Sequence, residues 1–523
     1  MAYRSSVPAG RGGFAPLVHA EWTKFRTVRG WVIGMVVAIL ATLSILFVAH
    51  DSCGNNGAAC SLPLGPGGEA VTDSFYFLHR PLGSGGTLTV RMTSLTGLIP
   101  NGSGGGRARA GEPGGALGSN SHPGLEPWSK AGIIIDASTT MGSAYAAMMV
   151  TGSHGVRMQW DYTGDTAGLG GAVSAASPRW LRLTRADDTI TGYDSADGVH
   201  WSLAGTVTLP GLPAVVQAGM FAASPAYTHI VSQSLGGSTG TGGPTAATGT
   251  FDHVGLQGDW PGGTWSGQDI GSNAMYPQAP GGSRQAGDTF SVTGSGDIAP
   301  DVPGSGGGGG IGITHVMDGT FAGLIAVIVV GTMFITAEYR RGLIRTTLTA
   351  SPRRGRVLAA KTLVTGLVTF AAGLVAAGIA LPLGSHQLTV GGSFVDPVST
   401  LAAVQLVAGT AALFAVVAVL ALAIGAVVRQ NAVAVTAAIA VVVLPWLLSS
   451  LLSGSASDWL LRVTPAAGFA VQSVYPKYPQ LNASYGLFGG YYPLAPWAGF
   501  AVLCGWTAVL LGLAVFLLRR RDA

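Results

Sequence analysis

Residues 401–428 read LAAVQLVAGTAALFAVVAVLALAIGAVV and contain no charged side chain. A helix of about 20 mostly apolar residues crosses the roughly 30 Å of hydrocarbon in a bilayer. Only 10% of the 523 residues are charged, against about 25% in soluble domains. Similar stretches occur at 30–49, 316–337, 357–383, 432–453 and 495–518. Six such stretches argue against buried helices of a soluble protein and predict an integral membrane protein with six transmembrane helices.

The first stretch has two alternative interpretations, a cleaved signal peptide and a lipoprotein signal. Its apolar run is longer than the usual h-region, and no A-x-A cleavage site follows it. The residues His50-Asp51-Ser52 before Cys53 make a poor lipobox. The sequence therefore favours a first transmembrane helix at 30–49.

Basic residues mark alternate loops. Of the 28 Lys and Arg residues, 16 lie in four segments, whereas the loop 384–398 has none. The four segments are residues 1–29, residues 338–361, Arg429 and residues 519–521. Because Lys and Arg are concentrated on the cytoplasmic side of membrane proteins, we expect a multi-pass plasma-membrane protein with both termini in the cytoplasm and residues 50–315 outside. That outer segment has 10 basic and 18 acidic residues. The net charge of +4 therefore comes from the cytoplasmic loops and does not indicate nucleic-acid binding.

The three cysteines do not form a disulfide framework. Cys53 and Cys60 are close together in the outer segment, where an oxidising compartment favours a disulfide between them. Cys504 lies inside an apolar run, which indicates a small packing residue.

Residues 14–28 have the pattern of an interfacial helix. Lys24 and Arg26 lie at the edges of its apolar face, where they suit lipid headgroups, but Glu21 projects toward that face. The alternative is an ordinary cytoplasmic tail. The apolar face consists of Phe14, Leu17, Val18, Trp22, Phe25 and Val28.

A second cytoplasmic signature follows the second predicted helix. The loop 338–361 reads EYRRGLIRTTLTASPRRGRVLAAK, in which Leu343, Ile344 and Leu348 give a short apolar face and Pro352 ends the helix. A short amphipathic helix between two membrane helices is a place where a soluble partner can bind. The alternative is a solvated basic loop that only fixes topology.

Together, the segment AEWTKFRTVRGW at 20–31 and the Glu-x-x-x-Gly…Leu…Pro…Arg…Lys loop resemble the type-2 ABC exporter permeases. The resemblance covers residues 14–49 and 316–521. It implies an elbow helix that includes Trp22, Lys24, Phe25 and Arg26. It also implies a coupling helix in loop 338–356 on which a separate ATPase docks. The docking residues would be Glu338, Gly342, Leu343, Leu348, Pro352 and Arg354. The large outer segment departs from the family, because typical members have a short first outer loop.

The energy source is expected to lie outside the chain. No ionisable side chain lies deep in a predicted membrane helix, which argues against ion coupling. No G-x-x-x-x-G-K-[ST] motif is present, so we expect no cofactor bound directly and ATP hydrolysis by a partner subunit. Six helices are half of a typical twelve-helix ABC pore. We therefore expect a dimer of permeases, either homomeric or heteromeric.

The outer segment is predicted to be all-β. The run RWLRLTRADDTITGYDSADGVHWSLAGTV at 179–207 alternates polar and apolar residues, with turns at Asp187-Asp188 and Asp197-Gly198. Residues 70–255 resemble a concanavalin/laminin-G-like jelly roll. We therefore expect a six-helix membrane bundle with an inserted jelly-roll sandwich at about 62–255 and a Gly-rich stalk at 256–315. Some strand-like pieces occur at 256–302, so an accessory subdomain is the alternative there.

Several jelly rolls of this kind bind glycans, so Trp180, Tyr193 and Trp201 are candidate contacts for a cell-wall glycan. Tryptophans in strands more often pack in or beside a core, so packing is the competing interpretation. No metal-ligand cluster and no glycosidase carboxylate pair stands out. The leading hypothesis is an ABC exporter permease. The alternatives are a membrane-anchored glycan-binding or sensing protein and a membrane-bound glycan hydrolase.

Overall fold

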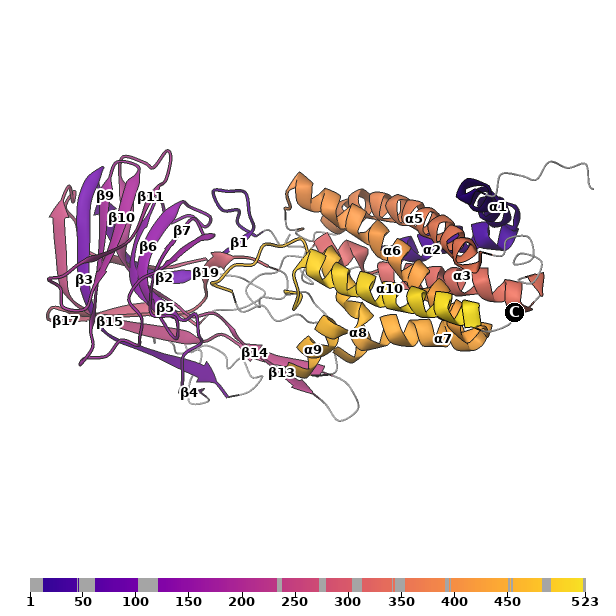
Figure 1. Cartoon of the computed structure of the whole chain (residues 1–523). Helices are drawn as coiled ribbons and strands as arrows, with labels where there is room; N and C mark the ends of the chain where they lie inside the picture. Colours follow the sequence, from indigo (N-terminus) through magenta and orange to yellow (C-terminus); the bar gives the residue numbers. More distant parts are fainter. Residues whose placement is uncertain are drawn as a thin grey trace, which may run out of the picture.

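The computed structural model consists of a β-sheet part and a helical bundle, which lie end to end in Figure 1. Of residues 228–232 and 238–242 only the backbone is described. The described residues are 13–44, 46, 62–101, 121–232, 238–271, 279–302, 313–340, 342–343, 353–390, 395, 397–449, 452, 455–481 and 491–520.

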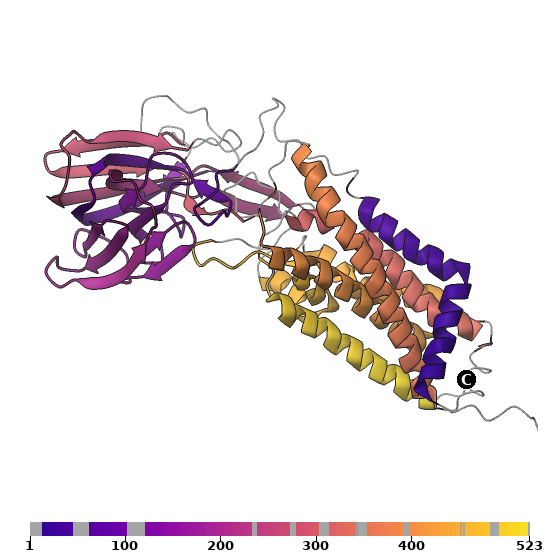
Figure 2. The ribbon, with the colours of Figure 1, turned by 90° about the horizontal axis from the view of Figure 1, so that it is seen from above.

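The bundle is built from long helices and short helical segments. At one end lie α1, the last turn of α3, the start of α5 and the last turn of α10, and we name this the terminal end (Figure 2). The opposite end faces the β-sheet part and is named the β end. The long helices are α2 (Arg29–Ser44), α3 (Thr320–Arg340), α5 (Arg354–Val390), α6 (Thr400–Val428), α7 (Asn431–Val442) and α10 (Pro496–Arg520). The shorter ones are α1 (Phe14–Thr27), η2 (Ile313–Met317), α8 (Leu444–Ser449), α9 (Ser455–Val463) and η3 (Pro465–Gln472).

Within the described residues, five helices are long and apolar enough to cross a membrane, or six if a bent pair counts as one. The bent pair is α1 and α2, whose axes differ by 74°. The sequence predicted six membrane helices, and α2 covers the first as far as Ser44. The fifth is divided into α7 and α8 beside Pro445, which has no amide hydrogen for the helical ladder.

The polar step between the fourth and fifth predicted helices has a clear structural basis. Ser399 begins α6 by accepting a hydrogen bond from the amide of Ala402 at 3.2 Å. At the other end Arg429 adopts a left-handed conformation with φ 64°, which stops the helix and lets α7 start at Asn431.

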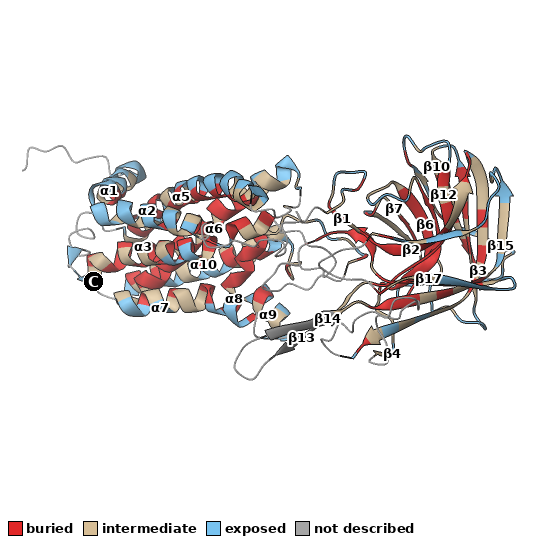
Figure 3. Cartoon of the chain, turned by 180° about the vertical axis from the view of Figure 1, so that it is seen from behind, coloured by how far each residue is buried: buried red, intermediate tan, exposed pale blue. Residues whose placement is uncertain are grey.

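Helix α6 is the centre of the bundle and packs against α3, α5 and α10. Its side chains from Leu413 to Ala423 are mostly buried, whereas the outer faces of α2 and α5 are exposed and apolar (Figure 3). Gly331 of α3 sits so close to α6 that an added Cβ would lie 2.6 Å from the carbonyl oxygen of Ala418. Small residues allow this close approach of membrane helices.

The β-sheet part, residues 62–302, contains two large antiparallel sheets that share one apolar core. The first sheet has the order β11-β10-β9-β3-β15-β18-β17, with β4 beside β3. The second has the order β16-β2-β12-β5-β6-β7-β8. The strands of the first sheet are β11 (Ser202–Thr208), β10 (Thr189–Ser195), β9 (Arg179–Ala186), β3 (Gly85–Pro100), β15 (Ala246–Gly258), β18 (Thr289–Gly294), β17 (Gly282–Ala286) and β4 (Ser121–Pro123). Those of the second are β16 (Ser266–Ile270), β2 (Phe75–Leu82), β12 (Val216–Ala223), β5 (Lys130–Asp136), β6 (Tyr145–Thr151), β7 (Val156–Trp160) and β8 (Gly164–Ala167). Two small pairs complete the part, β1 (Val71–Asp73) with β19 (Ile298–Pro300) and β13 (Tyr227–Ser232) with β14 (Ser238–Gly243).

The predicted stalk differs from what is observed. Strand β16 pairs with β2, β17 and β18 extend the first sheet beyond β15, and β19 pairs with β1. The reason is the alternation in β18, which places Phe290 and Val292 in the shared core despite the surrounding glycines. Residues 303–312 of the predicted stalk lie outside the described residues.

The second sheet is apolar on both faces. Strands β5 and β6 are buried at every residue. One face contributes to the shared core, and the other buries Phe77, Ile134 and Phe221 beneath Val71 of β1 and Ile298 of β19. A strand covered on both faces has a nearly continuous apolar sequence rather than an alternating one. The chain thus closes the outer face of this sheet with its own segments.

Candidate functional site

Four charged side chains meet at the terminal end of the bundle. Glu21 and Lys24 come from α1, Glu338 from the last turn of α3, and Lys361 from the second turn of α5. Lys361 Nζ lies 2.6 Å from Glu21 Oε2 and 2.7 Å from Glu338 Oε1. Lys24 Nζ lies 2.7 Å from Glu21 Oε1 and 3.0 Å from Glu338 Oε1. We name these four residues the charge cluster.

The charge cluster is neutral overall and largely buried. The side chain of Lys361 is 1% exposed and that of Glu21 is 4% exposed, whereas Lys24 is 40% exposed. Lys361 Nζ also lies 4.6 Å from the centroid of the Phe334 ring. A buried ion pair is favourable only if each charge has close partners, and here each lysine has two carboxylates.

The charge cluster fixes both ends of the segment that joins α3 to α5. Glu338 precedes this segment and Lys361 follows it, so the two ion pairs hold both flanking helices to α1. Phe25 of α1 adds an edge-on contact with Phe334 of α3, at 5.5 Å between ring centroids. The three helices therefore meet as one packed unit at this end.

The six residues predicted to dock an ATPase have different environments. Glu338 is only 8% exposed and its carboxylate points into the charge cluster, so its direct partners are lysines of this chain. Leu343 is 48% exposed, and Gly342 beside it has φ 69°, a conformation that favours glycine. Arg354 begins α5 and donates a hydrogen bond to the carbonyl oxygen of Leu518 in α10. Leu348 and Pro352 lie outside the described residues.

The predicted interfacial residues divide between two surroundings. Trp22 and Arg26 are exposed, as expected for a helix at a membrane surface. Phe25 is 3% exposed, and Lys24 belongs to the charge cluster. Glu21, which broke the apolar face in the sequence, is buried because it meets Lys361.

Sequence reasoning did not pair Glu21 with Lys361, although each carried a signal. Glu21 was the charged residue on an apolar helical face, and Lys361 stood at the start of an apolar run. A second contact that it missed places the guanidinium of Arg429 5.0 Å from the centroid of Tyr339, which links the end of α6 to α3.

The structure brings the three glycan candidates to one surface. Trp180 of β9 and Tyr193 of β10 lie on the outward face of the eight-stranded sheet, because alternate residues such as Leu181 and Leu183 point into the core. Trp201 directly precedes β11 and lies against Arg182 of the same face. All three are half-buried. Two arginines stack on the tryptophans: Arg182 lies 3.7 Å from the centroid of Trp201 and Arg91 lies 5.8 Å from that of Trp180.

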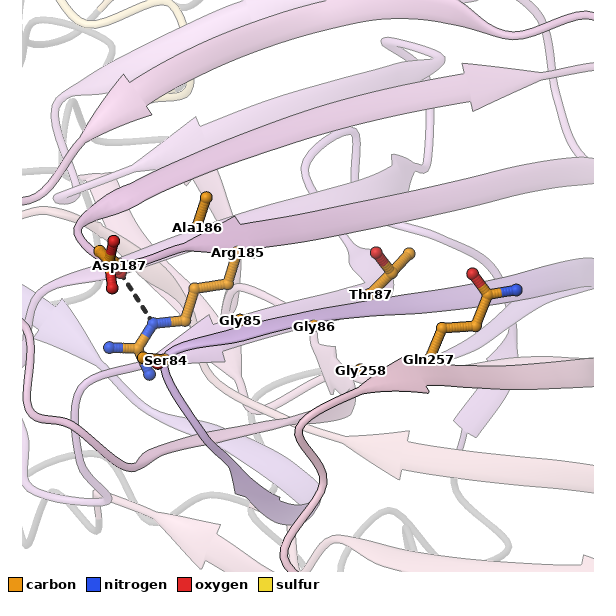
Figure 4. Close-up of a pocket in the computed structure, with 9 residues that line it drawn as sticks. All are labelled: Ser84, Gly85, Gly86, Thr87, Arg185, Ala186, Asp187, Gln257 and Gly258. Atoms are coloured by element: carbon orange, nitrogen blue, oxygen red, sulfur yellow. Dashed lines mark hydrogen bonds between the residues drawn. The ribbon is translucent and has the colours of Figure 1, made fainter.

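A recess lies at one end of the interior strands β3, β9 and β15 of the same sheet, lined by Ser84, Thr87, Arg185, Asp187 and Gln257 among others (Figure 4). Arg185 is already bonded to main-chain oxygens, with Nε 2.9 Å from that of Asp187 and Nη1 2.8 Å from that of Gly83. The basic side chain of this recess therefore has a structural role.

Cys53 and Cys60 lie outside the described residues, so their predicted disulfide remains a prediction. Cys504 is a free, half-buried residue of α10. Among the residues that the structure describes, no group of three His, Cys, Asp or Glu side chains is arranged to hold a metal ion.

Comparison with known proteins identifies the family. The family model described as "ABC-2 family transporter protein" matches residues 216–523, from β12 to the end of the chain. The chain therefore belongs to this family of membrane-embedded permease subunits of ABC transporters, whose partner is an ABC ATPase. No curated protein matches the chain in sequence.

Solved structures resemble parts of the chain only distantly. A functionally unknown protein from Saccharomyces cerevisiae is 18% identical, with 39% of this chain and 85% of that chain covered and a TM-score of 0.22. Scytalido-glutamic peptidase is 11% identical, with 43% and 98% covered and a TM-score of 0.23. Peanut lectin is 8% identical, with 48% and 96% covered and a TM-score of 0.16.

Proposed function

We propose that this chain is the permease of an ABC exporter in the plasma membrane, with the terminal end of its bundle in the cytoplasm and its β-sheet part outside. The observation that supports this function is the charge cluster, which fastens both flanks of the segment between α3 and α5 to α1. Both chain termini then lie in the cytoplasm, and six helices cross the membrane.

In this proposal the ATPase docks on loop 338–356. Leu343 is an exposed apolar contact for it, with Leu348, Pro352 and Arg354 as its further contacts. Glu338 contributes indirectly, because its carboxylate holds the start of the loop against Lys361 and Lys24. A displacement of the loop then moves α1, α3 and α5 together rather than bending one helix.

Two permeases form the transporter, and the energy comes from ATP hydrolysis in the partner subunits. The chain itself performs no hydrolysis in this proposal. The β-sheet part is proposed to be a jelly roll inserted between the first two membrane helices.

Docking can be tested with a charge placed on the exposed apolar residue. Leu343→Asp should abolish co-purification of the ATPase from native membranes, because a carboxylate would replace an apolar contact. Leu203→Asp is the matched control, since Leu203 is also exposed, at 61%, but lies in the β-sheet part. Retention of the ATPase by both variants would exclude loop 338–356 as the docking site.

A second candidate function is glycan binding by a membrane-anchored sensor. It is favoured by the common outward face of Trp180, Tyr193 and Trp201, on which aromatic rings can stack on sugars. Binding of cell-wall glycan fragments to the full chain, with loss in Trp180→Ala, would support it. Equal binding by the wild type and that variant would contradict it.

A further inference from the structure

A short segment that starts with the last residue of η3 contacts three separate regions of the molecule. It comprises residues 472–480, and we name it the strap. η3 itself is buried from Pro465 to Val471 and packs against α6 and α10. The strap therefore begins inside the bundle, and the loop between η3 and α10 reaches the β-sheet part in Figure 1.

The first contact lies within the bundle. The side-chain amide of Gln472 donates hydrogen bonds to the hydroxyls of Thr320 at 3.1 Å and Thr410 at 3.0 Å. Thr320 begins α3, and Thr410 lies about 15 Å along α6. Both threonines are fully buried. One neutral amide thus joins α3 to α6 near the β end.

The second contact involves the connection between the two parts. The hydroxyl of Tyr475 accepts a hydrogen bond from the amide of Ile313 at 2.8 Å. Ile313 begins η2, which leads from the β-sheet part into α3. The strap is therefore attached to the helix entry as well as to the bundle interior.

The third contact reaches the β-sheet part. Gln480 is 1% exposed, and its Nε2 donates a hydrogen bond to the carbonyl oxygen of Tyr162 at 2.7 Å. Tyr162 has φ 60° and the preceding Asp161 has φ 43°, so two consecutive non-glycine residues adopt left-handed conformations. Such conformations persist only where surrounding contacts hold them. The hydroxyl of Tyr162 is held in turn by Asp73 at 2.7 Å.

We propose that the strap couples the β-sheet part to the packing of α3 and α6, so that this part is a cap whose position follows the opening of the β end. The inference rests on the proposed function in that opening of the β end is a step of transport. All three attachments are neutral hydrogen bonds, which break and re-form more easily than the ion pairs of the charge cluster. A motion that starts at the terminal end would therefore change the contacts at the β end.

The experiment measures amide hydrogen exchange in two variants of the full-length chain, each at the site distant from its substitution. Gln472→Leu removes the amide in the bundle, and exchange is measured in the β-sheet part at residues 160–164. Gln480→Leu removes the strap amide that bonds to Tyr162 of the cap, and exchange is measured at residues 313–324. Coupling between two sites is reciprocal, so each variant should raise exchange at the distant site about fivefold to tenfold. Gln285→Leu is the matched control, because Gln285 is exposed and, among the described residues, its side-chain amide bonds only to the nearby Gly287 carbonyl.

Exchange that rises only beside each substitution, as with the control, would overturn the proposal. The result does not depend on an ATPase, so it is separable from the proposed function. Loss of ATPase co-purification from the wild-type chain would refute the permease role alone. In the assembled transporter, Gln480→Leu should change ATP turnover at least about twofold while the ATPase stays bound. Unchanged turnover would refute the coupling of the cap to transport.

Discussion

Two groups of buried carboxyl side chains, one in the bundle and one in the β-sheet part, differ in their partners. Glu21 and Glu338 in the bundle each have two lysine ammonium groups within 3.0 Å. Asp73 and Asp301, at the base of the β-sheet part, have none among the described residues. Both oxygens of Asp301 are buried without a hydrogen-bond partner in the described part of the chain.

The difference shows what a nearby cation does for a buried acid. Burial raises the pKa of Asp301 to about 7 and that of Asp73 to about 6, although Tyr162 and the Gly142 amide lower the latter in part. Asp297 is the contrast within the same region, because Lys130 Nζ lies 2.6 Å from its Oδ1. Ion-paired acids join elements together, whereas unpaired ones make the fold sensitive to pH.

Removing the central cation should have the largest effect. In Lys361→Met, two buried carboxylates face each other with only the half-exposed Lys24 between them. We expect a loss of about 3–5 kcal/mol in stability, measured by thermal unfolding in detergent. Lys477→Met, at an exposed lysine, is the control. Partial recovery of stability in the double variant Lys361→Met/Glu338→Gln would show that the charge imbalance causes the loss. Unchanged stability in Lys361→Met would refute the importance of the charge cluster.

A smaller effect, a dependence of stability on pH, is expected from the unpaired acids of the β-sheet part. A folded-state pKa above the ordinary value near 3.8 means that the folded β-sheet part binds more protons than the unfolded chain. The stability that these two acids contribute should therefore be highest below about pH 4 and fall as pH rises from there to about 7. Asp301 alone should account for about 2–3 kcal/mol between pH 5 and 8. Asp301→Asn should reduce this slope and raise the melting temperature at pH 8.

Asp297→Asn should change the stability in the direction opposite to Asp301→Asn. Lys130 is fully buried, so loss of the carboxylate leaves an uncompensated ammonium group. We expect destabilisation of about 2–3 kcal/mol at neutral pH. If both asparagine variants changed stability in the same direction, the distinction between paired and unpaired acids would be wrong.

The smallest effect is expected at the exposed member of the charge cluster. Lys24 is 40% exposed, so solvent screens its ion pairs and Lys24→Ala should lower stability by less than about 1 kcal/mol. Lys361 keeps both carboxylates paired in this variant. A thermal shift as large as that of Lys361→Met would show that the two lysines are equivalent, contrary to their burial.

Much of the fold was predictable because the signals are local. Twenty apolar residues in a row identify a membrane helix whatever surrounds them, and alternation in residues such as 179–186 identifies a strand. The loop at 338–361 was also evident, since its apolar face and Pro352 are close in sequence. Strands β16 to β19 were not assigned to the sheets because glycines weaken their alternation, and only pairing with β2, β15 and β1 fixes their place.

By itself, the sequence determined the membrane class and the β-rich region, because hydropathy and periodicity act over neighbouring residues. Only the tertiary structure decided which charges meet. Glu21 and Lys361 are 340 positions apart, and Gln480 and Tyr162 are 318 apart. Nothing in a local pattern specifies such partners, because they are selected by the packing of whole helices and sheets against one another. The charge cluster and the strap exist only once that packing has brought distant side chains together.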